Sequence, residues 1–123
     1  MTAFSYQLYS SRNFPPLSGT FKMLSELGYT QAEGYGALFQ NPETVSEIEA
    51  SLAETGLAMP TAHMGLDFVR DTPSRAIEVA KALGISAVFI PHTTEQDRDA
   101  QGWSDFGTQI AEAGKPLQDA GLK

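Results

Sequence analysis

The feature that most constrains this chain is a glycine that recurs after each of four amphipathic segments. The tripeptides LGY, TGL, LGI and AGL contain Gly28, Gly56, Gly84 and Gly121, which are spaced 28, 28 and 37 residues apart. A glycine just past the end of a helix commonly takes the left-handed conformation that stops the helix. A helix, a glycine stop and a short apolar segment that repeat at this interval indicate successive β–α units.

Four segments before these glycines have the periodicity of helices, with apolar residues at steps of three and four. Their stripes are Leu17, Phe21, Leu24 and Leu27; Val45, Ile48 and Leu52; Ile77, Ala80 and Leu83; and Trp103, Phe106, Ile110 and Leu117. Asn41–Pro42 and Thr72–Pro73 are typical helix starts, with an N-cap before a proline at the first helical position. Pro116 cannot donate a backbone hydrogen bond, which predicts a kink or break in the fourth helix. We expect Trp103 to pack in the core.

Four short strands are predicted between these helices, at 4–9, 30–35, 58–63 and 87–92. Gly34 and Pro60 disfavour a central strand, but the repeat requires strands at their positions. Strands that alternate with helices predict a parallel sheet with right-handed crossovers. Two architectures fit: an open doubly wound sheet, or half of a (β/α)8 barrel, which needs about 250 residues when complete.

Polar residues of one parity near the strand ends favour the barrel. They are Gln7 and Tyr9 on the first strand, Gln31, Glu33 and Tyr35 on the second, and Thr61 and His63 on the third. A strand buried in an open sheet is usually apolar on both faces, whereas the mouth of a barrel collects polar groups at carboxyl ends. We therefore expect an α/β fold, a parallel (β/α)4 half-barrel, with 1–123 as a single domain.

Composition excludes several classes of function. The formal net charge of −7, without a cluster of cations, argues against nucleic-acid and anionic-membrane binding. A small anionic substrate stays compatible with that charge, since a few local donors can outweigh the overall field. The sequence has neither an apolar run long enough to cross a bilayer nor the pattern of a signal peptide. With no cysteine in the chain, these features predict a cytoplasmic protein.

Five segments, in this order, resemble the sugar phosphate isomerase/epimerase family of xylose-isomerase-like TIM barrels. They are QLYSSR (7–12), AEGYG (32–36), TAHMGL (61–66), VFIPHTTEQDR (88–98) and WSDFGTQIAEAGKPLQDAGLK (103–123). The resemblance implies the amino-terminal half of such a barrel, with LQDAGLK leading to the position of a fifth strand. It also implies a sugar or sugar-phosphate substrate. The family's divalent metal (Mn, Mg, Co or Zn) is held by residues of later strands, so we expect this chain to bind none.

Two residues at strand ends are candidate catalytic groups. Glu33 ends the second strand before Gly34 and Gly36, which we expect to let a substrate or neighbouring chain approach closely. His63 ends the third, and an imidazole suits a reaction that moves a proton between adjacent atoms. In each case the alternative is a structural residue, either a solvated glutamate or a packed histidine.

Four further residues are candidate substrate-binding groups. His92 ends the fourth strand, where it can bind a hydroxyl, pack, or join Glu33 and His63 as a zinc ligand. Arg12, in the loop after the first strand, is the cation best placed for a phosphate or carboxylate, with a surface arginine as its alternative. Tyr9 and Gln7 line the expected pocket or fill the barrel floor.

Three functions compete. The first is a sugar isomerase or epimerase acting through an enediolate. The second is a catalytically silent half-barrel that self-associates, because two sheet edges and an open lumen are costly to expose. We expect such a homo-oligomer to cover a lumen face built from Tyr6 or Tyr9, Leu8, Met59, and Val88 or Ile90. The third, a nuclease related to apurinic-endonuclease barrels, is disfavoured by the acidic charge.

Overall fold

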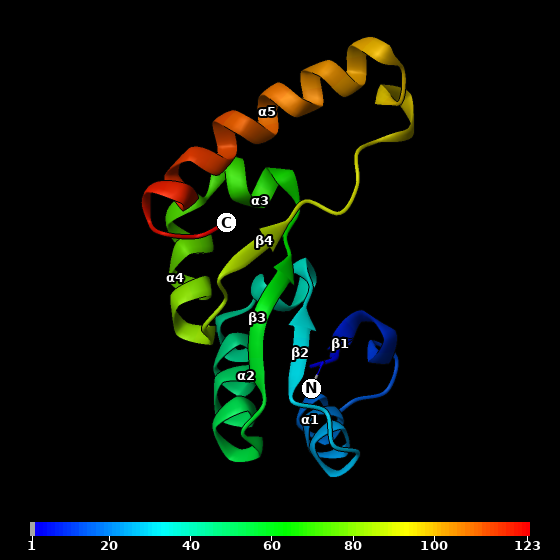
Figure 1. Cartoon of the computed structure of the whole chain (residues 1–123), viewed down its shortest axis with the longest axis vertical. Coiled ribbons are helices and arrows are strands. Elements are labelled where there is room, and N and C mark those ends of the chain that lie inside the picture. The colour runs from blue at the N-terminus through cyan, green and yellow to red at the C-terminus, as the bar shows by residue number, and fades with distance from the viewer. Residues whose placement is uncertain (1) are drawn as a thin grey trace.

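The computed structural model describes residues 2–123, in which four parallel strands form one sheet in the order β1-β2-β3-β4, with helices between them (Figure 1). The strands are β1 (Ser5–Gln7), β2 (Gln31–Gly34), β3 (Ala58–His63) and β4 (Ala87–Phe89). The α-helices are α1 (Leu17–Glu26), α2 (Pro42–Thr55), α3 (Leu66–Asp71), α4 (Pro73–Leu83) and α5 (Ala100–Asp119). Three single turns of 3₁₀-helix are η1 (Leu8–Ser11), η2 (Gly36–Phe39) and η3 (Glu95–Asp97). The predicted α/β class is confirmed.

The four repeated glycines stop helices as predicted. Their φ angles are positive: 85° at Gly28, 71° at Gly56, 72° at Gly84 and 90° at Gly121. At three of these stops the residue after the glycine donates its N–H to the carbonyl five residues earlier: Tyr29 to Leu24 (3.0 Å), Ile85 to Ala80 (2.8 Å) and Leu122 to Leu117 (2.9 Å). This is the Schellman arrangement, and it turns the chain from each helix toward the sheet.

Of the two predicted helix starts, one is capped as expected and one is not. The Asn41 side chain accepts a hydrogen bond from the N–H of Glu43 at 2.9 Å and caps α2. Helix α4 begins at Pro73, but the Thr72 hydroxyl donates to the carbonyl of Phe68 at 2.7 Å and so closes the preceding helix, α3. The sequence analysis did not predict α3, since its six residues are too few to show a helical period.

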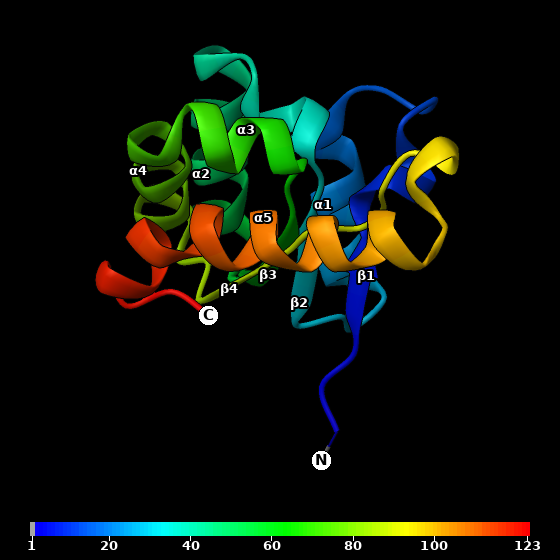
Figure 2. The same ribbon diagram turned by 90° about the horizontal axis from the view of Figure 1, so that it is seen from above.

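The fourth helix departs from expectation in two ways. Helix α5 continues through Pro116 without a break, because only the hydrogen bond to the carbonyl four residues earlier is lost and the buried Ala113 and Leu117 hold the last turns in place. Trp103 is 52% exposed and packs against Phe106 at 6.0 Å between ring centroids, so it is not a core residue. The amino-terminal half of α5 extends beyond α3 and α4 (Figures 1 and 2).

Two of the apolar residues expected to line the lumen, Leu8 of η1 and Met59 of β3, lie on the helix-covered face of the sheet. Leu8 and Met59 are each only 1% exposed and pack in the core with Phe21 and Ile48. The expected apolar lumen face was therefore wrong in these residues. Their burial follows from the alternation of side chains along a strand, which turns the polar parity to the open face. Leu27, the last residue of the first predicted stripe, is 67% exposed.

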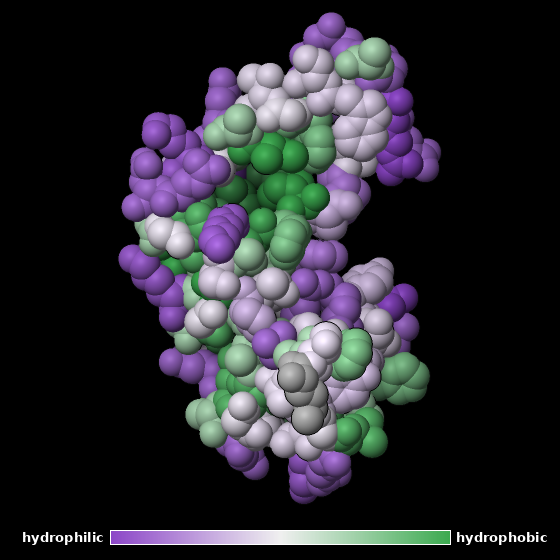
Figure 3. Space-filling view, viewed as in Figure 1, coloured by the Kyte–Doolittle hydropathy of each residue, from purple (hydrophilic) through white to green (hydrophobic). Residues whose placement is uncertain are grey.

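Helix α5 does not pack closely against β4. A cavity of about 150 Å³ separates them, and its lining includes Val88 of β4, Ile90 just after β4, and Ile110 of α5. Figure 3 shows apolar side chains gathered in a hollow between α5 and β4. The chain that follows α5 pairs with β4: the N–H of Lys123 donates to Ser86 O (2.9 Å), and the N–H of Val88 donates to Lys123 O (2.8 Å). This is the hydrogen-bond pattern of a parallel neighbouring strand.

Within residues 2–123, no helix combines the length and apolar character needed to cross a membrane.

Gly34 is required by packing rather than by access to a ligand. A Cβ at this buried position would lie 2.5 Å from Phe39 Cζ and 3.0 Å from Met59 Sδ, so the Phe39 ring occupies the space that a side chain would need. The expectation that Gly34 admits a substrate was therefore wrong. Gly36 is different, since a Cβ there would meet only ordinary contacts at 3.7 and 3.9 Å.

We expect Gly34→Ala to lower the free energy of unfolding by about 1–3 kcal/mol, the usual cost of overpacking a core. Gly36→Ala serves as the matched control and is expected to change that free energy by less than about 0.5 kcal/mol. Urea unfolding followed by circular dichroism measures both. Equal stability of the two variants would contradict the packing role of Gly34.

The Arg70 side chain joins two carboxylates on α3. Its guanidinium donates to Asp67 Oδ1 at 2.8 Å and to Asp71 Oδ1 at 2.7 Å. The hydrogen bond from Arg70, aided by its charge and opposed by a smaller desolvation, lowers the pKa of Asp71 below its ordinary value. Because the folded-state pKa is depressed, the pair stabilises the fold above the unfolded pKa and loses this effect as the pH falls through the folded one.

We expect Arg70→Ala to raise the pKa of Asp71 back toward its ordinary value. An NMR titration of the side-chain carboxyl carbon measures this change. Arg98→Ala, which removes an arginine that is bonded to Thr93 O instead, is the control and should leave the Asp71 titration in place. An unchanged midpoint in Arg70→Ala would show that the guanidinium does not set the pKa.

Candidate functional site

The parallel register places three polar side chains in one row across the sheet. Gln7 of β1 pairs with Glu33 of β2, and Glu33 pairs with Thr61 of β3. All three belong to the parity that the sequence analysis assigned to one face. They lie toward the carboxyl ends of their strands, where parallel α/β folds collect their functional groups.

Glu33 is the centre of this row. Its Oε1 accepts a hydrogen bond from Gln7 Nε2 at 3.0 Å, and its Oε2 accepts one from the Thr61 hydroxyl at 2.6 Å. The side chain retains 19% of its exposure, so the carboxylate is held on both sides and is only partly exposed. These two donors, one on either side, restrict the orientation of the carboxylate, whereas the side chain of a solvated glutamate can rotate.

His63 stands one pleat above Thr61 and meets the same carboxylate. Its Nε2 lies 3.4 Å from Glu33 Oε1, and its Nδ1 lies 3.3 Å from Gln7 Nε2. The Phe89 ring packs edge-on against the imidazole at 6.4 Å between centroids, and the His63 side chain is 37% exposed. The structure thus brings both candidate catalytic residues and Gln7 into one cluster.

An open groove of about 640 Å³ lies over this cluster. Its walls come from the last residues of β1 and β3 and from the segments that follow all four strands: Gln7, Tyr9, Tyr35, Gly36, Ala37, Gln40, His63, Met64, Gly65, Asp67, Phe68, Pro91 and His92. The groove combines aromatic and apolar walls with a few convergent polar groups, which is typical of small-molecule sites.

Tyr9 and Arg12 form one rim of the groove. The Tyr9 ring packs edge-on against Tyr35 at 5.2 Å, and the Arg12 guanidinium carbon lies 4.0 Å from the centroid of the Tyr9 ring. Arg12 Nη1 donates to Tyr9 O at 2.9 Å, so the cation is held at the rim although it does not line the groove. The remaining N–H donors of the exposed guanidinium suit an anionic group such as a phosphate or carboxylate.

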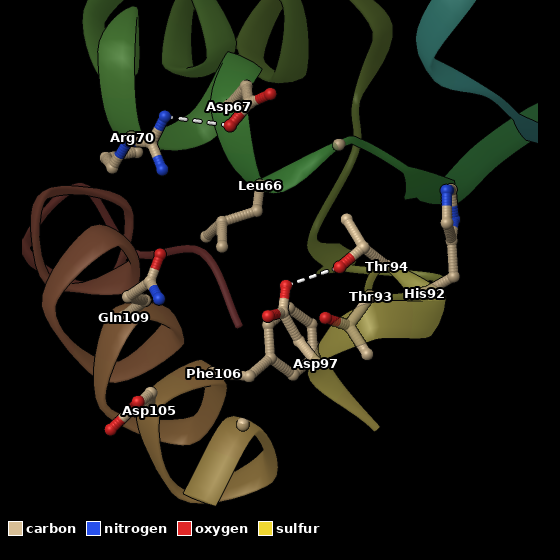
Figure 4. A pocket seen from close by; sticks show the side chains of 12 residues that line it. Leu66, Asp67, Arg70, His92, Thr93, Thr94, Asp97, Asp105, Phe106 and Gln109 are labelled. Atoms are coloured by element: carbon tan, nitrogen blue, oxygen red, sulfur yellow. Dashed lines mark hydrogen bonds and ion pairs between the residues drawn. The ribbon is translucent and has the colours of Figure 1, made fainter. Parts of the chain in front are cut away.

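His92 stands apart from the cluster. It is exposed and lines the groove beside Pro91, after the end of β4. Among the residues that the structure describes, it has no hydrogen bond to Gln7, Glu33 or His63. It also borders a second cavity of about 390 Å³ between α3 and α5 (Figure 4), so it joins two hollows rather than one.

The second cavity is a poorer candidate for a ligand-binding site than the groove. Its cation, Arg70, is bound by Asp67 across the cavity wall, as Figure 4 shows, and by Asp71. The Asp97 carboxylate is likewise bonded to the Thr94 hydroxyl. Charged groups already satisfied by protein partners leave little for a ligand to bind.

The donors of this chain do not form a metal site by themselves. No group of three or more histidine, aspartate or glutamate side chains within residues 2–123 is arranged to hold a metal ion. Glu33 and His63 are adjacent, but His92 does not join them as the third ligand that the sequence analysis considered. The divalent metal implied by the resemblance does not fit the residues present.

Three contributors to the site were not among the candidate residues, although the sequence analysis placed Thr61 and Tyr35 in the polar parity. Thr61, which bonds Glu33, has the same parity as the named residues and was identifiable from that pattern. Tyr35 and Phe89 pack against Tyr9 and His63, but a contact between rings depends on strand register and rotamer, which a single sequence does not reveal.

No protein-family model and no curated protein matches the sequence. Solved structures do match the fold. A family 2 AP endonuclease from Brucella melitensis superposes with a TM-score of 0.76 at 17% identity, over 100% of this chain and 54% of its own. The probable 3-DHS dehydratase AsbF of Bacillus anthracis, involved in petrobactin synthesis, gives 0.74 at 15% identity, over 98% and 50%.

A third match is a xylose isomerase-like TIM barrel protein from Mycobacterium smegmatis, solved in complex with magnesium. It superposes with a TM-score of 0.66 at 16% identity, over 100% of this chain and 55% of its own. The chain therefore spans about half the length of the structures it matches. Its four parallel strands and intervening helices have the fold of half of a xylose isomerase-like TIM barrel.

Proposed function

We propose that this chain forms half of an acid–base site that isomerises or epimerises a sugar or sugar phosphate. The observation that carries the proposal is the Glu33 carboxylate, held by Gln7 at 3.0 Å and Thr61 at 2.6 Å and contacted by His63 at 3.4 Å. A carboxylate and an imidazole in contact at the ends of parallel strands can accept and return a proton. The groove beside them is lined by His63 but not by Glu33, and its volume of about 640 Å³ is in the range of small-molecule sites.

The reaction class follows from the chemistry of these groups. In an isomerisation or epimerisation a base takes the proton α to a carbonyl, and the electron pair of the C–H bond moves to the carbonyl oxygen as an enediolate. The proton then returns to another face or carbon. Glu33 and His63 are the proton-transfer pair in this proposal, and a divalent metal, when bound, would stabilise the charge on the enediolate. Since the residues present do not hold a metal, we assign no step to it.

The substrate-binding part of the proposal uses the groove and its rim. His92, Tyr9 and Gln7 line the groove, where hydroxyl groups of a sugar would meet them. Arg12 at the rim supplies charge-assisted donors for a phosphate. The formal net charge of −7 argues against a DNA phosphate backbone as the ligand, although one structure of similar fold is an AP endonuclease.

A second candidate is a catalytically silent half-barrel that self-associates. The observation that favours it is a cluster of exposed apolar side chains at the amino-terminal ends of β1 and β2. There Phe4 is 71% and Leu27 is 67% exposed, beside Tyr29. Sedimentation velocity at high concentration separates the candidates. A stable oligomer without ligand binding favours the silent half-barrel, and a monomer that binds sugars favours the first.

Arg12→Ala is expected to weaken binding of a hexose phosphate about tenfold, the equivalent of about 1.5 kcal/mol for one charge-assisted hydrogen bond. Binding of the unphosphorylated hexose should not change, because Arg12 contacts only the phosphate in this proposal. NMR titration, followed at the His63 and His92 ring signals, measures both affinities. Lys81→Ala removes an exposed cation from α4 and is the control. An equal loss for both sugars would exclude a phosphate-specific role for Arg12.

We expect no measurable isomerase or epimerase turnover from the 123-residue chain alone, with or without Mn²⁺, Mg²⁺ or Co²⁺. Without a metal site the enediolate lacks a stabilisation of several kcal/mol, so the activation free energy stays higher by that amount. Each increment of about 1.4 kcal/mol lowers the rate tenfold. Exchange of the substrate α-proton with deuterated solvent, followed by NMR, is the measurement. A metal-dependent exchange that His63→Ala abolishes would overturn this expectation.

A further inference from the structure

Gln7 is bonded to the protein at every polar atom of its side chain. Its Oε1 accepts from the N–H of Tyr9 at 2.8 Å, and its Nε2 lies 3.0 Å from Glu33 Oε1 and 3.3 Å from His63 Nδ1. A side-chain amide has two N–H donors and a carbonyl oxygen with two lone pairs, and these three partners use both donors and one lone pair. Gln7 therefore has a task within the protein in addition to lining the groove.

The orientation of this amide is dictated by the backbone. Gln7 is the N-cap of η1, and the free N–H of Tyr9 in the first turn needs an acceptor. Only the carbonyl oxygen of the amide can accept that hydrogen bond. The NH₂ group must then point the other way, toward Glu33 and His63.

The amide in turn selects one form of the imidazole. A neutral histidine carries its proton on one ring nitrogen and accepts at the other. Gln7 Nε2 can only donate, so His63 Nδ1 must accept, and the ring proton lies on Nε2. That nitrogen lies 3.4 Å from Glu33 Oε1, in contact with the carboxylate but not hydrogen-bonded to it.

We propose that Gln7 is a positioning residue that holds His63 in the Nε2–H form, which makes Glu33 the proton acceptor of the pair and His63 the donor. With Nδ1 occupied by Gln7 and Nε2 protonated, the imidazole has no free lone pair for a substrate proton. Glu33 keeps free lone pairs beyond those bonded to Gln7 and Thr61. The assignment of acceptor and donor rests on the proposed function, whereas the form of the ring does not.

The test is long-range ¹H–¹⁵N NMR of the ring nitrogens in the full 123-residue chain, at neutral pH and without ligand. In the unmodified chain we expect His63 Nδ1 at an unprotonated shift and Nε2 at a protonated one. Gln7→Glu keeps an acceptor for Tyr9 N–H but turns a second acceptor toward His63. In this variant the His63 Nδ1 signal should therefore move to the chemical shift of a protonated nitrogen.

Two controls accompany this variant. Gln31→Glu adds the same charge to the same parity of β2, two residues before Glu33, and should leave His63 Nδ1 unprotonated. His92, the second of the two histidines of the chain, is the internal reference and should not move in either variant. In Gln7→Leu, which offers neither donor nor acceptor, His63 should show the averaged pattern of His92.

A protonated Nδ1 in the unmodified chain would overturn the inference, and this measurement does not depend on whether a variant folds. An unmoved Nδ1 signal in folded Gln7→Glu, or equal movement in Gln31→Glu, would do the same. Because no substrate is present, failure of the proposed isomerase chemistry appears separately. The ring can be held in the Nε2–H form while no α-proton exchange or sugar binding is detected.

Discussion

The groove depends on the parallel register of the first three strands. Gln7, Glu33 and Thr61 are partners across β1, β2 and β3, so one carboxylate receives a donor from each side. A slip of one residue in any strand would turn these groups to the helix-covered face and expose apolar residues in their place. The same alternation along β2 and β3 places Ala32 and Ala62 on the buried side of the strands, so packing of the core and geometry of the site reinforce each other.

The polar row also explains how half of a barrel can leave a sheet face open. Glu33, Thr61 and His63 are each partly exposed, whereas Leu8 and Met59 are buried among the helices. Water can solvate hydrogen-bonded polar groups at small cost, and burying the apolar parity supplies the stabilisation that holds the sheet. The face that would line a barrel is therefore chemically suited to solvent or to a polar ligand.

Local sequence signals predicted the repeating framework well, and the reasons are physical. Gly28, Gly56, Gly84 and Gly121 stop helices through a backbone conformation that depends on one residue at a time. The parity of Gln7, Glu33 and Thr61 was likewise readable along each strand. The exposure of Trp103, the continuity of α5 at Pro116 and the ring contacts of His63 depend on which elements meet in space, and periodicity carries no information about that.

The turn η2 links the two sides of β2. Its Phe39 ring fills the space beneath Gly34 in the core, while Gly36, Ala37 and Gln40 line the groove on the opposite side. One short segment thus anchors the strand that carries Glu33 and also shapes the wall that a ligand would touch. Substitutions at Ala37 and Gln40 can alter the width and polarity of that wall while Phe39 keeps the carboxylate in place. Ligand preference and framework rigidity are separable within five consecutive residues, 36–40.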